Sequence, residues 1–339
     1  MTMHEIAALA GVSIGTVDRV LHKRGRVSAA TREKVEGIID HYRFIPNPIA
    51  RRLKRGRAYR FCALIPRRDQ DAGYWAQALE GIEAGAAELR PLGAETEILE
   101  YDRYSLGEAW GMLDRALAAD PDGMIFAPIV LIKPLLEKVR ERGIPCVFFD
   151  SDFPGVNPLC RIRQDPVRGG YLAGRLMHLF MGTEKRPMGV LNIHSQDYHI
   201  IKRRDGFVRY AEEQGVPTVV RDYAGEEELS GAEMGRFLED CPDLAGVFVT
   251  NCLAHRVART LKSRRRGDLF IIGYDLIPGN RRLLEEGFMD AVIAQRPEEQ
   301  GRRSVLALYR HIALEEPVEP EIDIPLDIYV RENIPGERS

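Results

Sequence analysis

From about residue 58 onward, short apolar segments alternate with longer amphipathic segments. The segments expected as strands are 61–65, 94–101, 123–128 and 146–149, and helix patterns cover 74–89 and 106–119. Strands that are apolar throughout and are separated by helices predict a parallel sheet with both faces covered. The chain is therefore expected to have an α/β fold with a doubly wound sheet.

A second set of strands follows at 189–193, 219–223, 246–250 and 269–273, each trailed by a helix pattern. We therefore expect two lobes, the first at about 58–159 and 292–321 and the second at about 160–291 and 322–339. Sheets of this kind bind ligands beyond the carboxyl ends of their strands, so two facing lobes predict a cleft between them.

Polar and aromatic residues lie at or near the predicted strand ends, where a core would exclude them. They are Asp69, Tyr74, Trp75, Asp150, Ser151, Arg203, Asn251, Asp275 and Gln295. Carboxylates and amides share hydroxyl protons, a guanidinium donates two parallel hydrogen bonds, and an aromatic ring covers the apolar face of a sugar. This set predicts a polyhydroxylated ligand. Two alternatives stay open, because Asp150 could cap the next turn and Trp75 could contact the other lobe.

Basic residues are dense around one of these positions, at Lys202, Arg203 and Arg204, with His194 and His199 nearby. These residues are compatible with a phosphorylated or acidic sugar as the ligand, but several of them could instead be solvated surface residues.

The first sixty residues are strongly basic, with a net charge of +8, whereas the remainder carries −11. Such asymmetry suggests that one end of the chain meets a polyanion, with salt-dependent affinity.

Short helix patterns fill this basic end. Thr2 and Glu5 form a capping box, and Ile6, Leu9 and Ala10 are expected to share the inward stripe of the first helix. Gly11 permits a sharp turn and Ser13 caps a second helix, in which Val17, Val20 and Leu21 face the core. A third helix is expected from Ser28 to about Tyr42.

This all-α head resembles the helix-turn-helix domain of the lactose-repressor (LacI/GalR) family. The matching segments are Ile6-Ala7, Ala10-Gly11-Val12-Ser13, Thr16-Val17-Asp18-Arg19-Val20-Leu21, Val27-Ser28, Thr31-Arg32-Glu33-Lys34-Val35 and Tyr42-Arg43-Phe44-Ile45-Pro46-Asn47. The resemblance implies a DNA-binding domain at 1–45 and an effector-binding and dimerisation body at 58–339 that is similar to periplasmic sugar-binding proteins.

In such motifs the second helix enters the major groove with its first residues against the bases. The resemblance therefore implies DNA contacts from Ser13, Ile14, Gly15, Thr16, Asp18 and Arg19. Arg19 is expected to contact a guanine, or alternatively to clamp a phosphate. Asp18 stands where serine is common in the family, and it either reads a base or orients Arg19.

Between head and body, residues 46–57 are basic and bounded by helix breakers, with Asn47 and Pro48 as a start signal for one short helix. The resemblance implies a hinge helix that pairs on DNA and inserts Leu53, with Ala50 one turn earlier, into the minor groove. The alternative is a basic linker whose leucine packs on the body.

The resemblance also implies that Arg203, Asn251, Asp275 and Gln295 are recurrent effector contacts. Relatives usually have aspartate after this asparagine, whereas here Cys252 follows Asn251.

No enzyme, cofactor or metal motif is apparent. The chain has no Walker-type loop and no His-Glu-x-x-His, and Gly81 and Gly85 are expected where a helix packs closely on the sheet. The five cysteines lack paired spacing, and Cys62 and Cys146 are expected as buried thiols. An odd cysteine count and the lack of a secretory segment favour the cytoplasm, and no apolar run is long enough to span a membrane.

These features predict a sequence-specific DNA-binding regulator, usually a repressor in this family, of a carbohydrate-utilisation operon. A homodimer would bind a pseudo-palindromic operator under control of a sugar, polyol, sugar phosphate or sugar acid. The alternative is a solute-binding transport component that does not read DNA. The sequence is compatible with an effector that acts as an inducer or as a co-repressor, because lobe closure can either release DNA or promote its binding.

Overall fold

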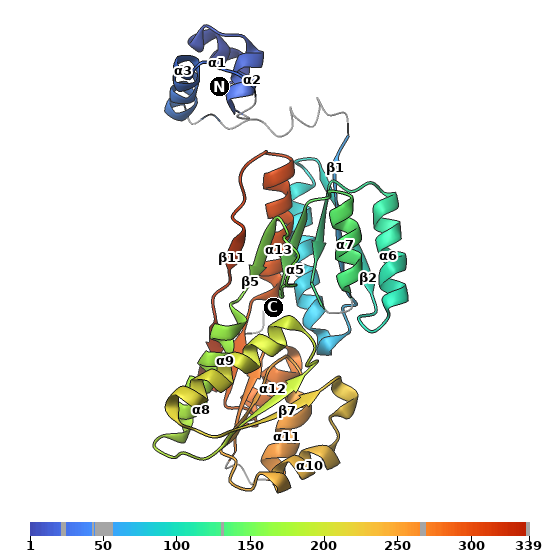
Figure 1. Cartoon of the computed structure of the whole chain (residues 1–339), viewed down its shortest axis with the longest axis vertical. Helices are drawn as coiled ribbons and strands as arrows, with labels where there is room; N and C mark the ends of the chain where they lie inside the picture. The colour runs from blue at the N-terminus through green and yellow to red at the C-terminus, as the bar shows by residue number, and fades with distance from the viewer. Residues whose placement is uncertain (22–24, 43, 45–56, 130–131, 265–268, 337–339) are drawn as a thin grey trace.

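A computed structural model describes residues 1–21, 25–42, 44, 57–129, 132–264 and 269–336 (Figure 1). A small helical head and a two-lobed α/β body confirm the predicted fold class. The predicted hinge helix lies outside the described residues except at Arg57, and so do Asn47, Ala50 and Leu53. No helix in the described part of the chain has the length and apolar character to cross a membrane.

The head consists of α1 (Met3–Ala10), α2 (Ile14–Leu21) and α3 (Ala29–His41). The predicted capping box is present, with the Glu5 amide 3.2 Å from Thr2 Oγ1 and the Thr2 amide 2.7 Å from Glu5 Oε2. Gly11 ends α1 at a φ of 69°, a left-handed conformation that glycine adopts without strain. The prediction for Leu9 is wrong, because its side chain is half exposed, whereas Ala7 is buried beside Ile6.

The first lobe contains a sheet of six parallel strands in the order β11-β5-β4-β3-β1-β2. The strands are β1 (Tyr59–Pro66), β2 (Ala94–Tyr101), β3 (Gly123–Phe126), β4 (Cys146–Phe149), β5 (Cys160–Arg163) and β11 (Glu321–Asp323). Cys62 is buried in β1 and Cys146 is partly buried in β4, and burial raises the thiol pKa values to about 12 and 11, respectively.

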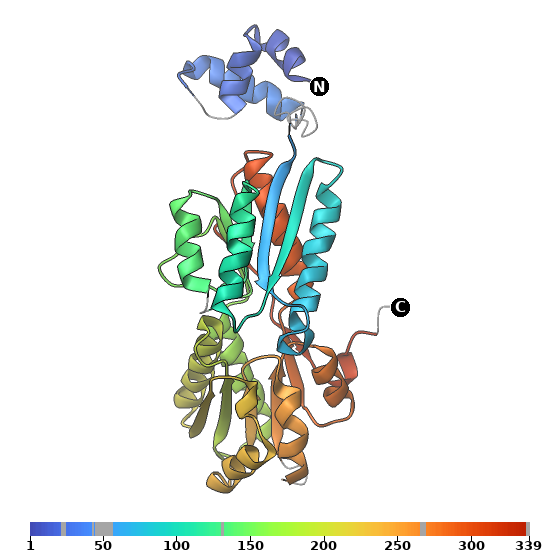
Figure 2. The same cartoon turned by 90° about the vertical axis from the view of Figure 1, so that its right-hand side faces the viewer.

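Two helices cover each face of this sheet, as the views in Figures 1 and 2 show. The pair α6 (Leu106–Ala118) and α7 (Lys133–Glu141) lies on one face, and the pair α5 (Tyr74–Leu89) and α13 (Pro297–Ile312) on the other. Gly81 and Gly85 allow α5 to approach α13 rather than the sheet, which corrects the prediction. A Cβ atom at Gly81 would lie 2.0 Å from the carbonyl oxygen of Glu298.

The second lobe has its own six-stranded sheet in the order β12-β10-β9-β8-β6-β7, in which β12 alone is antiparallel to its neighbour among the described strands. Its strands are β6 (Met188–Ile193), β7 (Thr218–Tyr223), β8 (Gly246–Val249), β9 (Phe270–Tyr274), β10 (Ala291–Ala294) and β12 (Asp327–Tyr329). Helices α8 (Pro166–Met181) and α9 (Tyr198–Gln214) cover one face, and α10 (Gly231–Asp240), α11 (Ala254–Arg264) and α12 (Pro278–Glu285) cover the other.

The chain crosses between the lobes a few residues later than predicted. Residues 160–163 still form β5 of the first lobe, paired with β4, and residues 291–294 still form β10 of the second lobe, paired with β9. The third crossing falls between β11 and β12. A strand belongs to the sheet whose neighbour satisfies its backbone hydrogen bonds, and this partner is not visible in a local apolar pattern.

Candidate functional site

A polar cleft lies between the lobes at the carboxyl ends of their parallel strands. Its free volume is about 30 Å³, room for roughly two water molecules. The lining residues are Asp71, Tyr74, Trp75, Arg103, Ile129, Asp150, His194, Asp197, His199, Ile200, Arg203, Asn251, Cys252, Asp275 and Gln295. A sugar therefore enters this cleft only if the lobes part or side chains rearrange.

The cleft brings together seven of the nine predicted effector residues: Tyr74, Trp75, Asp150, Arg203, Asn251, Asp275 and Gln295. Ser151 is fully buried just behind the lining. The structure does not bring Asp69 into the cleft, because this residue is exposed on the loop after β1. Its place is taken by Asp71, which opens the short 3-10 helix η1 (Asp71–Gly73) before α5.

Several lining residues have left-handed backbone conformations. Of the eight non-glycine residues with positive φ in the described part of the chain, four line the cleft: Asp71 (50°), Asp150 (68°), His194 (58°) and Asp275 (63°). The last three directly follow β4, β6 and β9. Such conformations are costly for residues other than glycine and concentrate at functional sites, where the surrounding structure enforces them.

An ion-pair network centred on Arg103 joins the two lobes. Its guanidinium contacts Asp71 of the first lobe and, at 2.7 Å, Asp197 at the start of α9 in the second lobe. Asp71 also accepts a hydrogen bond from Trp75 Nε1 at 2.6 Å and lies 3.3 Å from His194 Nε2. Burial alone would raise the pKa of Asp71, but Arg103 and His194 bring it well below its usual value. A buried charge of this kind is stable only while its partners remain in place.

Asp150 faces the cleft rather than capping the next turn. Its Oδ1 accepts a hydrogen bond from the Tyr74 hydroxyl at 2.5 Å, and its amide donates to Gln300 Oε1 at 2.8 Å. Burial raises the pKa of Asp150 to about 6. Trp75 also lines the cleft, and its indole nitrogen bonds within its own lobe.

Arg203 is held in place by three contacts. Its two terminal nitrogens donate to the Thr250 carbonyl at 2.9 Å and to Gln295 Oε1 at 3.0 Å, and its guanidinium carbon lies 3.6 Å from the ring centre of Tyr274. Helix α8 passes so close that a Cβ atom at Gly170 would lie 1.7 Å from the Arg203 carbonyl oxygen. Glycine at position 170 therefore sets the position of the arginine backbone.

Asp275 has an unused acceptor. Its Oδ2 accepts from Gln295 Nε2 at 3.3 Å, whereas its buried Oδ1 has no hydrogen-bond partner among the described residues. Burial raises the pKa of Asp275 to about 7. Asn251 differs, because its amide group binds the backbone at both ends, to Ile193 and Leu253, at 3.1 Å each. A buried acceptor without a donor is rare and marks Asp275 as a candidate ligand contact.

Ser151, His199 and Asp150 resemble a hydrolytic triad only superficially. His199 Nδ1 lies 2.9 Å from Ser151 Oγ, but its Nε2 lies 4.0 Å from Asp150, which is beyond hydrogen-bond reach. Ser151 is also fully buried and does not line the cleft. Burial holds the pKa of His199 well below its usual value, so its ring is neutral and bridges the lobes.

The candidate DNA surface is the outer face of α2. Ile14, Gly15 and Arg19 are exposed, while Thr16 and Asp18 are partly exposed. Ser13 caps the helix as predicted, with its Oγ 3.2 Å from the Thr16 amide. Arg19 Nε donates to the Gly15 carbonyl at 3.0 Å, so the guanidinium lies along the outer face of its own helix.

Comparisons with known proteins match both parts of the chain. Residues 62–316 match the model described as periplasmic binding protein domain, and residues 2–47 match bacterial regulatory proteins, lacI family. The chain belongs to the LacI family of bacterial regulatory proteins. It is a DNA-binding transcriptional regulator with a body of the periplasmic-binding-protein type, and the alternative of a transport component that does not read DNA is not favoured.

Relatives of this LacI-family chain include regulators of similar length. It is 29% identical to the HTH-type transcriptional regulator DegA of Bacillus subtilis, with 81% of each chain covered. It is 27% identical to the sucrose operon repressor of Lactococcus lactis, covering 80% of this chain and 82% of that protein. The crystal structure of a putative LacI transcriptional regulator from Bacteroides fragilis matches with a TM-score of 0.75 at 25% identity, over 82% of this chain and 98% of the other.

Sequence reasoning missed Asp71, Arg103 and Asp197 in the cleft and treated His194 and His199 only as part of a basic cluster. Arg103 and His194 could have been found, because each follows a strand end, β2 and β6, as Asp150, Asn251, Asp275 and Gln295 do. No local signal identifies Asp197, which reaches the cleft only because the lobes face each other.

Proposed function

We propose that this regulator binds a sugar or polyol between its lobes and reads its operator according to whether that site is filled. The proposal rests chiefly on one observation, the buried and unpaired Oδ1 of Asp275 beside the side chains of Arg203 and Gln295. An acceptor of this kind fits a ligand hydroxyl, and Tyr74 and Trp75 offer aromatic surface for the apolar face of a sugar ring. A relative named as the sucrose operon repressor supports the same ligand class.

The lobes provide the means of control. Contacts from both lobes meet in the cleft, so a ligand that fits one degree of closure better than another shifts the population of lobe arrangements. We propose that a homodimer couples this change to the spacing of its two heads on a pseudo-palindromic operator in the cytoplasm. Ser13, Ile14, Gly15, Thr16, Asp18 and Arg19 would face the major groove, and Asn47, Ala50 and Leu53 would form the hinge.

A thermal-shift screen of pentoses, hexoses and polyols tests this function. A true effector is expected to raise the melting temperature in a saturable way and to change operator affinity. Asp275→Ala should abolish the shift and leave ligand-free DNA affinity intact, whereas Asp69→Ala, at an exposed carboxylate outside the cleft, should preserve both. A screen without any saturable hit, or a shift that survives Asp275→Ala, would reject the proposal.

A further inference from the structure

The cleft carries more negative than positive charge. Of its lining residues, all of them within the described part of the chain, four are carboxylates, Asp71, Asp150, Asp197 and Asp275, and two are arginines, Arg103 and Arg203. His199 is neutral, since burial holds its pKa well below the usual value. With all four carboxylates ionised, negative charges exceed the guanidinium charges by two.

The terminal nitrogens of both guanidiniums are already engaged, whereas the Nε of each is buried without a hydrogen-bond partner among the described residues. Arg103 is held between the carboxylates of Asp71 and Asp197. Arg203 donates to a backbone carbonyl and to Gln295, and it stacks on Tyr274. A phosphate or carboxylate entering the cleft would find only these two Nε donors free, and binding the terminal nitrogens would require displacing a present partner and leaving buried groups unpaired.

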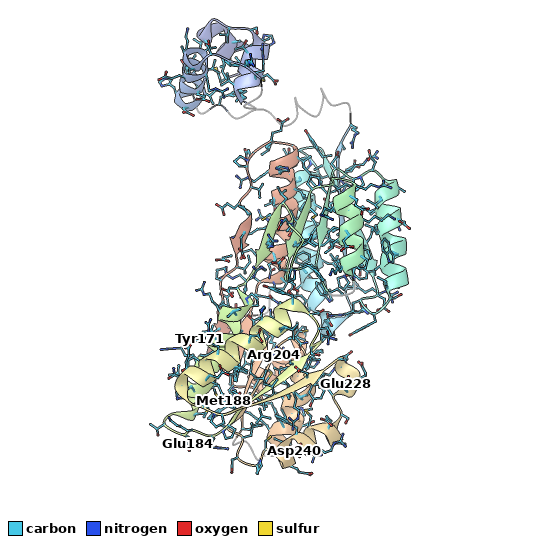
Figure 3. All side chains as sticks on the ribbon, in the orientation of Figure 1. Tyr171, Glu184, Met188, Arg204, Glu228 and Asp240 are labelled. Atoms are coloured by element: carbon cyan, nitrogen blue, oxygen red, sulfur yellow. The ribbon has the colours of Figure 1, made fainter. Side chains whose placement is uncertain are left out.

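The basic residues beside Arg203 do not compensate. Lys202 and Arg204 are absent from the cleft lining, and their nitrogens lie 3.3 and 2.9 Å from carboxylate oxygens of Asp205. Their side chains are 37% and 29% exposed, respectively. Figure 3 shows Arg204 on α9 in the second lobe. Of the basic residues that admitted an anionic sugar in the sequence, Lys202 and Arg204 therefore lie outside the candidate site, whereas Arg203, His194 and His199 line it.

Acidic residues outside the lining lie close to Tyr104, and one of them, Glu226, is paired with Arg256 at 2.8 Å. Tyr104 follows Arg103 and is 57% exposed, with its ring centre 6.1 Å from that of His194. Partial burial, together with Asp71 and, to a smaller extent, Glu226 and Glu227, raises the pKa of Tyr104 to about 12 even though Arg103 lowers it. These glutamates belong to the acidic 3-10 helix η3 (Glu226–Glu228).

We infer, resting on the proposed function, that the effector carries no phosphate or carboxylate: the cleft accepts uncharged or amine-bearing sugars and polyols and rejects anionic ones. Hydroxyl or ammonium protons would satisfy the unpaired Asp275 Oδ1, whereas an anion would meet carboxylates on the walls of both lobes.

Titration calorimetry on the full-length protein tests this discrimination against anionic ligands. The measurements compare ligands that share a carbon skeleton, at about pH 8, where the carboxylates are mostly ionised. For each skeleton, namely glucose, galactose, mannose and ribose, the plain sugar is compared with its amino, phosphorylated and acid forms where these exist. Any skeleton that binds is expected to bind at least about tenfold more tightly without the anionic group. Equal or tighter binding of the anionic member would overturn the inference.

Asp150→Asn tests whether charge causes the discrimination. The variant removes one negative charge while keeping an oxygen that accepts from Tyr74, so the affinity ratio of uncharged to anionic ligand should fall severalfold. Asp69→Asn, which removes a solvent-exposed carboxylate, should leave the ratio unchanged. An unchanged ratio in Asp150→Asn would count against a charge-based mechanism.

Inorganic phosphate serves as a probe that does not depend on finding the sugar. It is expected to give no saturable rise in melting temperature beyond that of a matched chloride control. A saturable rise that Arg203→Gln abolishes would overturn the inference. If no sugar of any class binds, the proposed function fails, and the phosphate result still decides whether the cleft holds anions.

Discussion

The outer face of α2 and the interlobe cleft both present polar groups for recognition, but they are built differently. On α2 the recognition side chains are exposed or partly exposed, and the hydrogen bonds of Ser13 and Arg19 stay within about one helical turn, as between Arg19 and Gly15. In the cleft the groups are buried, and several connect residues far apart in the chain, such as Arg103 and Asp197. A substitution on α2 should therefore alter binding alone, whereas one in the cleft should also alter folding.

The largest effect is expected for Arg103→Met. Removing the guanidinium leaves the buried carboxylates of Asp71 and Asp197 without the cation that both contact, which should lower the free energy of unfolding of the body by about 3–5 kcal/mol in urea denaturation. Arg115→Met is the control, because its ion pair with Glu97 is exposed and should contribute at most about 1 kcal/mol. Equal losses in the two variants would show that the network does not hold the lobes together.

Gly170→Ala should be the next most damaging change. The added methyl would overlap the Arg203 carbonyl, so α8 and α9 must separate, at about 1–3 kcal/mol in unfolding free energy and with weaker effector binding. Gly111→Ala in α6, where nothing lies within 4 Å of the new Cβ, should instead stabilise the protein by about 0.5–1 kcal/mol. A stable Gly170→Ala variant with normal effector affinity would contradict the close helix contact.

Arg19→Ala should change DNA recognition without changing stability. Discrimination between operator and random DNA is expected to fall by about 1–3 kcal/mol in competition binding, leaving weak, salt-sensitive association. Lys34→Ala on α3 removes an equivalent charge from an exposed position, and should weaken binding to both kinds of DNA alike. If Arg19→Ala retains discrimination, the arginine clamps a phosphate rather than reading a base.

The smallest effect concerns pH. A carboxyl group whose pKa is raised in the folded state stabilises at low pH and loses that contribution as pH rises through the folded value, which is about 7 for Asp275. From about pH 8 to 6.5 this group should therefore add about 1 kcal/mol to the free energy of unfolding, and Asp275→Asn should remove that contribution to the melting temperature. The buried neutral His199 opposes this contribution increasingly as the pH falls through about 6.5, because the unfolded state then gains a proton.

The sequence was sufficient for most of the fold and for much of the cleft. Asp150, Asp275 and Gln295 were found because parallel strands end at a common edge, so any polar residue that follows a strand falls there. Asp69 was predicted instead of Asp71 because the loop after β1 turns through left-handed conformations at Asp71 and Ala72. An aspartate followed by an alanine does not by itself indicate such a turn.

Longer-range features were beyond reach. Asp197 contributes to the cleft only because it lies opposite Arg103, 94 residues away, once both lobes have formed. The short strands β5 and β11 were missed because three or four residues carry little pattern of their own and are defined by pairing, of β5 with β4 and of β11 with β5.

The position of α13 has a consequence for how the protein is made. This helix completes the first lobe, packing on α5 near Gly81, yet it emerges from the ribosome after the five parallel strands of the second lobe. During synthesis the apolar side of α5 around Ala78 and Ile82 consequently stays uncovered until residues 297–312 arrive. In ribosome-bound chains stalled before residue 297 is exposed, we expect proteases to cut within the first lobe, while the second lobe already resists them.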